Sequence, residues 1–159
     1  MSVPLTQALG ITHMATLSDD FIAQPTEAQG YLVAAQGMLA GALPLEKLAP
    51  LPVFALTLLC GHSCEAALKA VLAQSGIPAA ALSKAPYGHD ILKLWTSAES
   101  KGPVFPSPQP AWVAQLNRVY DKPFSLRYPL GFHAIVLPNQ IEMLRGTESL
   151  VSLAASFVK

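Results

Sequence analysis

The sequence predicts an all-α protein in which four to five helices form an up-and-down bundle. Three observations lead to this prediction. Apolar residues repeat at helical spacing in five stretches, Pro and Gly residues lie between those stretches, and no segment sustains the alternation of a strand. The chain of 159 residues has the size of one domain and is long enough to bury a core.

The first predicted helix follows an irregular arm at the start of the chain. Residues 1–25 form this arm, and we expect the bundle domain to cover residues 26–159. Thr26 is suited to be an N-cap because its hydroxyl can accept a hydrogen bond from a free backbone N–H. The apolar repeat then predicts a helix to about Leu43.

The second helix has the clearest pattern in the sequence. It follows a connection rich in proline, residues 44–52, and is predicted from about Pro52 to Gln74. Gly76 and Pro78 come directly after it, as a glycine C-cap followed by a proline. Its residues are apolar almost all round, which is typical of a helix at the centre of a bundle.

Three shorter or interrupted patterns complete the predicted bundle. A third helix is expected after the pair His89–Asp90, ending at Gly102. A fourth is expected over residues 111–121. The last begins after Pro138 and has a potential interruption at Gly146.

Charge is scarce along the whole chain. Only 13% of residues are charged, 52% are hydrophobic, and the formal net charge is +0. A surface with so few charges predicts that a second subunit covers part of it, so we expect a homodimer. The net charge provides no electrostatic footprint for sequence-independent nucleic-acid binding. The stretch from Lys84 to Arg145 has a small basic excess, which is either a local patch or a scatter of solvated charges.

Cysteine usage and hydropathy indicate a soluble cytoplasmic protein. Cys60 and Cys64 lie four residues apart, where a disulfide would be strained. His62 lies on a different side of the helix, so the three residues are not expected to bind one metal ion. We therefore expect buried free thiols in a reducing compartment. No signal peptide is visible, and the longest apolar run, residues 51–60, is too short to span a membrane.

A succession of short motifs resembles a known family. The matching positions are Glu65, Leu68, Lys69, Gly76, Gly88, His89, Asp90, Leu94, Tyr120, Arg127, Tyr128 and Pro129. In order and spacing they resemble the HEPN domain family (higher eukaryote and prokaryote nucleotide-binding), most closely its prokaryotic single-domain members. The resemblance covers about residues 27–155.

The resemblance implies a dimeric helical bundle and two classes of function. Many HEPN proteins are metal-independent ribonucleases that use an Arg-x(4–6)-His motif from each subunit of the dimer. Many of these are toxins whose antitoxin partner is a minimal nucleotidyltransferase. Other members have lost catalysis and serve as RNA-binding or scaffold modules. Neither class requires a metal or a cofactor.

Arg127 and His133 are the candidate catalytic residues. Five residues separate them, which fits the family motif. A neutral His133 could take the proton from a ribose 2′-OH, and Arg127 could hold the phosphate. Tyr128, followed by a Pro–Gly loop at 129–131, departs from the motif of catalytic members. The alternative is an Arg127 that forms a structural ion pair and a His133 that is an ordinary loop residue.

A second group of polar residues surrounds the second helix. The candidate binding residues are His62, Glu65, Lys69, His89, Asp90, Tyr120 and Tyr128. His62, Glu65 and Lys69 share one helix face, where they form either a nucleotide-binding cleft or a structural ion pair that fixes helix packing. We favour the structural interpretation.

His89 and Asp90 permit a similar choice between a structural role and a site. Asp90 is suited to cap the third helix, and His89 could bond to Glu65 or Tyr120 across the bundle. The functional alternative places His89 beside Arg127 in a composite pocket.

Two functional hypotheses therefore follow from the sequence. The first is a HEPN-like helical module without catalysis, which dimerises and binds a protein, a nucleic acid or a nucleotide. The second is a metal-independent endoribonuclease that uses Arg127 and His133.

Overall fold

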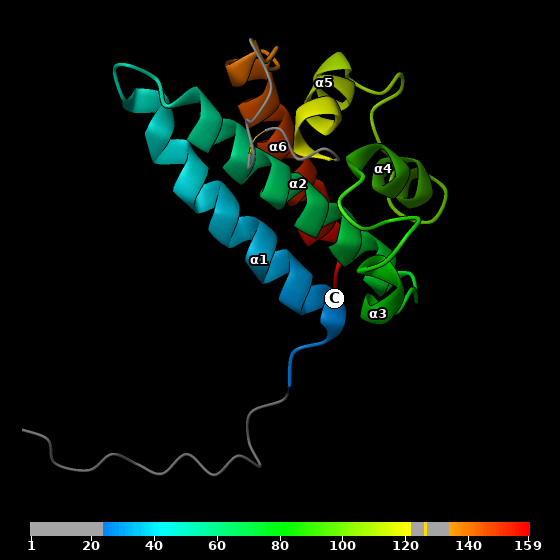
Figure 1. The fold of residues 1–159 in the computed structure, drawn as a ribbon. Helices are drawn as coiled ribbons and strands as arrows, with labels where there is room; N and C mark the ends of the chain where they lie inside the picture. Colours follow the sequence, from blue (N-terminus) through cyan, green and yellow to red (C-terminus); the bar gives the residue numbers. More distant parts are fainter. Residues whose placement is uncertain (1–23, 122–125, 127–133) are drawn as a thin grey trace, which may run out of the picture.

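The chain folds into an assembly of α-helices (Figure 1). The computed structural model describes residues 24–121, 126 and 134–159, and these residues include no strand. In chain order the elements are α1 (Glu27–Ala42), the 3-10 helix η3 (Leu43–Lys47), α2 (Val53–Gln74), α3 (Ala79–Leu82), α4 (Ile91–Glu99), α5 (Ala111–Tyr120) and α6 (Gln140–Phe157). The predicted all-α class is confirmed.

The five helices predicted from the sequence are all present, and two short helices were missed. The described chain contains six α-helices rather than four to five, because α3 forms in a segment expected to be a connection. Pro78 begins this turn, Leu82 buries its side chain, and the Glu27 carboxylate accepts a hydrogen bond from Ala79 N at 2.8 Å. η3 lies in the proline-rich connection after α1.

Helix α2 lies at the centre of the fold. It contacts α1, α3, α4, α5 and α6, and α1 runs antiparallel beside it (Figure 1). By length and composition α2 could cross a membrane, but 72% of its most apolar 18-residue stretch is buried inside the fold. That burial is what the core helix of a soluble protein shows.

The helix ends follow the chemistry predicted for them. Thr26 and Gln29 form a reciprocal capping box at the start of α1. After α2, Gly76 has φ of +92°, and Ile77 N donates to Leu72 O at 3.1 Å, which closes the helix. Asp90 accepts from Lys93 N at 3.1 Å and caps α4.

Gly146 does not interrupt α6, so the potential interruption predicted there is not found. A Cβ atom at this position would overlap the indole of Trp112. The glycine is therefore explained by close packing of α5 on α6, and the helix continues through it.

The two cysteines are free and buried, as predicted. Burial raises the pKa of Cys60 to about 11 and that of Cys64 to about 12, so both are thiols at neutral pH. Cys64 Sγ lies 3.3 Å from Thr147 Oγ1, a contact that joins α2 to α6. The thiols therefore act as small core groups.

Two glycines provide a matched test of the packing. A Cβ atom at Gly61 in α2 would overlap the ring of Tyr120, whereas a Cβ atom at Gly37 in α1 would meet nothing within 4 Å. Gly61→Ala should lower the free energy of unfolding, because overpacking costs about 1–3 kcal/mol and the gain in helix propensity offsets at most about 1 kcal/mol. Gly37→Ala should raise it by up to about 1 kcal/mol. Urea denaturation measures both, and a Gly61→Ala protein as stable as Gly37→Ala would contradict this packing.

Candidate functional site: a buried carboxylate beside a polar pocket

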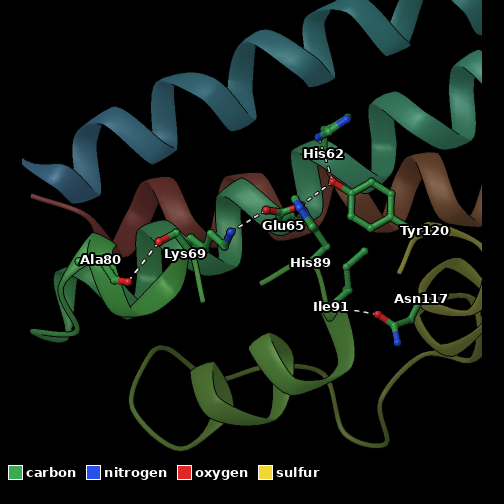
Figure 2. Close-up of polar contacts among 9 residues, drawn as sticks. His62, Glu65, Lys69, Ala80, His89, Ile91, Asn117 and Tyr120 are labelled. Atoms are coloured by element: carbon green, nitrogen blue, oxygen red, sulfur yellow. Dashed lines mark hydrogen bonds and ion pairs between the residues drawn. The ribbon is translucent and has the colours of Figure 1, made fainter. Parts of the chain in front are cut away.

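The Glu65 carboxylate lies at the centre of the polar cluster (Figure 2). Its Oε1 accepts a hydrogen bond from Lys69 Nζ at 2.6 Å. Its Oε2 accepts one from Tyr120 Oη at 2.5 Å and lies 2.9 Å from His89 Nδ1. Because an ionised carboxylate can only accept hydrogen bonds, His89 is the donor, through its Nδ1–H. Three donors therefore hold one buried carboxylate.

Three segments of the chain bring these donors together. Lys69 lies one helical turn after Glu65 on α2, so the local spacing places the two side chains side by side. Tyr120 is the last residue of α5, and His89 lies directly before the Asp90 cap of α4. The cluster therefore joins α2 to the start of α4 and the end of α5.

His62 extends the cluster along α2. Its Nδ1 lies 2.9 Å from Tyr120 Oη, and the two rings meet edge to face at 5.3 Å between centroids. Since the single Tyr120 proton is donated to Glu65, the phenol oxygen accepts from His62 Nδ1–H. The predicted common face of His62, Glu65 and Lys69 is thus found in the structure.

Asn117 holds the start of α4 from outside that helix. Its Oδ1 accepts from Ile91 N at 2.6 Å and from Leu92 N at 3.4 Å (Figure 2). The first turn of α4 is therefore capped twice, by Asp90 within the helix and by Asn117 from α5. Asn117 was not predicted as a site residue, because no local sequence spacing relates residues that lie 26 positions apart.

The cluster keeps its carboxylate ionised. Burial raises the pKa of Glu65, but the hydrogen bonds from His89, Lys69 and Tyr120 and the charge of Lys69 outweigh it, so the net effect lowers that pKa. Only 11% of the Glu65 side chain is exposed, against 40% of the His89 side chain. His89 thus lies between a buried anion and the surface.

A polar pocket of about 340 Å³ lies beside His89. It is lined by Ser83, Ala85, Pro86, Tyr87, Gly88, His89, Asp90, Lys93 and Asp121. Lys93 Nζ is 3.2 Å from Asp90 Oδ2, so the pocket's lysine is already paired. Asp121 has no ion-pair partner among the described residues. The pocket is therefore acidic on balance.

The structure brings together six of the nine residues named as site candidates. His62, Glu65, Lys69, His89 and Tyr120 form the cluster, and Asp90 lies next to it as a helix cap. Arg127, Tyr128 and His133 lie outside the described residues, so their convergence stays a prediction. Within the described ranges, no group of three or more His, Cys, Asp or Glu side chains is placed to hold a metal ion.

Comparisons of the chain with protein-family models, with curated proteins and with solved structures give no significant match. The HEPN resemblance therefore rests on the sequence motifs alone and stays a prediction.

Removing Lys69 should destabilise the fold strongly. Lys69→Met leaves the Glu65 carboxylate buried without its paired cation, which costs about 3–5 kcal/mol. Lys93→Met is the matched control, because it breaks an exposed pair and should cost less than about 1 kcal/mol. Equal losses for the two variants in chemical denaturation would show that the buried pair does not stabilise the fold.

The lowered pKa of Glu65 predicts a loss of stability in acid. A carboxylate whose pKa is lower in the folded state stabilises the protein above the unfolded pKa, near 4.5, and loses that effect as the pH falls through the folded pKa. The stability advantage of wild type over Glu65→Gln should therefore shrink as the pH falls below about 5. Glu142→Gln, at an exposed position of α6, is the control. An advantage independent of pH in thermal unfolding would refute the assignment.

Proposed function

We propose that the chain is a cytoplasmic HEPN-like helical module that self-associates and binds a protein partner without catalysing a reaction. The observation that carries this proposal is the saturation of Glu65 by Lys69, Tyr120 and His89. A general acid or base works best when its pKa lies near the working pH. The lowered pKa of Glu65 moves it away from that range, and its three donors occupy most of the lone pairs that could take up a proton.

The charge of the polar pocket favours a protein partner over a nucleic acid. Asp90, Asp121 and a paired Lys93 provide no free cation for a phosphate. A nucleic-acid site requires such cations to replace the counterions of the backbone. A basic side chain of a partner protein matches this pocket, with Asp121 as its counter-charge. The nucleotidyltransferase partner that the HEPN resemblance implies stays a prediction.

The outer face of α1 supports self-association. Between Ala28 and Ala42 the helix has no charged residue, and only Ala28, Ala35 and Ala42 are buried. Val33 is 67% exposed on this helix, and Phe54 is 52% exposed at the start of the neighbouring α2. An uncharged helix face with exposed apolar side chains is what a second subunit would cover.

A ribonuclease assay in EDTA tests the proposal against its alternative. We expect the purified protein to leave labelled structured and unstructured RNA intact. Cleavage that survives EDTA and disappears in His133→Ala would overturn the proposal and establish the ribonuclease with Arg127 and His133. The same RNA in a gel-shift experiment should show no retention at physiological salt, because the chain provides no basic footprint.

Sedimentation equilibrium tests the self-association. The wild type should be a dimer, and Val33→Glu should be a monomer because a charge would be buried at the interface. Val136→Glu is the matched control, since Val136 is 75% exposed and lies outside α1. A monomeric wild type, or a dimer dissociated only by Val136→Glu, would contradict this interface.

A further inference from the structure

An apolar pocket of about 350 Å³ lies where α4, α5 and α6 meet. Its walls are Trp95, Val104, Pro106, Pro110, Trp112, Gly146, Ser149, Leu150 and Leu153. They come from α4, the loop before α5, the start of α5 and the middle of α6. The volume lies at the small end of the range of ligand sites, about 300–1,000 Å³.

Both tryptophans of the chain line this pocket. Their ring centroids are 6.3 Å apart, and their planes meet at 85°. Trp112 packs directly on the backbone of α6, because position 146 is a glycine. Trp95 is 2% and Trp112 6% exposed, so each indole offers the pocket little more than an edge. A flat ring in this pocket could meet those edges with its face, an arrangement that aromatic groups prefer.

The polar side-chain groups of the walls form hydrogen bonds within the chain, with one exception. Trp95 Nε1 donates to Glu99 Oε1 at 2.8 Å, and Ser149 Oγ donates to Arg145 O at 3.0 Å. Trp112 is 6% exposed, and its indole N–H has no acceptor among the described residues. No fully buried side-chain nitrogen or oxygen in the described chain lacks a partner, so this N–H must reach solvent. The pocket is the solvent space that Trp112 lines.

We infer that this pocket binds a small planar aromatic molecule with one hydrogen-bond acceptor. The apolar walls provide the burial that stabilises the ring, and the Trp112 N–H provides the single polar contact that orients it. A charged ligand is disfavoured, because the lining residues include no charged side chain. This site is separate from the proposed function and does not depend on it.

The test uses two ligands of equal shape. Quinoline carries one ring-nitrogen acceptor, and naphthalene is its isostere without one. Binding is followed in ¹⁵N-labelled protein through the two indole N–H resonances, which report on this pocket alone since both tryptophans line it. We expect quinoline to bind with a dissociation constant on the order of 0.1–1 mM and to shift the Trp112 resonance.

Two variants locate the site and its polar contact. Ser149→Phe should fill the pocket and abolish binding, whereas Ser152→Phe, exposed on the same helix and not part of the lining, should retain it. Trp112→Phe should weaken quinoline about fivefold, the effect of one net hydrogen bond, and weaken naphthalene less than twofold. Equal weakening of both ligands would refute the acceptor role of the N–H. Absence of quinoline binding, or binding that Ser149→Phe leaves unchanged, would overturn the site.

Discussion

The buried Glu65 carboxylate is the constraint on which the arrangement of the helices depends. A carboxylate that is removed from water loses about several kcal/mol of hydration free energy. Only a paired charge and hydrogen bonds can offset this loss. Here the donors come from α2, from the end of α5 and from the residue before the α4 cap. Their distances fix how α5 and α4 are placed against α2. We infer that this cluster restricts shifts between the helices more than an apolar core alone would.

Local features of the fold could be predicted from the sequence, because they depend on residues close together in the chain. The helices follow from apolar repeats, the caps at Thr26 and Asp90 from side chains next to the helix starts, and the Glu65–Lys69 pair from helical spacing. Long-range partners could only be proposed as alternatives, as for His89. Asn117 was missed entirely, since the sequence around an asparagine in a helix does not show which distant backbone group its side chain will bond. The short α3 was missed because a tertiary hydrogen bond, donated by Ala79 N to the Glu27 carboxylate, stabilises it.

The two pockets are lined by different residues at the start and in the middle of the short helix α4. Asp90 and Lys93, at its start, line the polar pocket, and Trp95 lines the apolar one. The same helix is tied to α5 at both places, through Asn117 at its first turn and through Trp112 against Trp95. A ligand in either pocket would therefore contact α4, and a ligand in the polar pocket would also meet His89, which is bonded to Glu65 of α2.

The cap that Asn117 provides has a consequence for the order in which the chain is assembled. Helix α4 has 9 residues, and helices shorter than about 12–15 residues are marginal by themselves in water. Its second cap arrives from a residue that a ribosome adds 26 positions later. During synthesis α4 can already pack on α2, and we expect it to become more stable once α5 has emerged and docked on it.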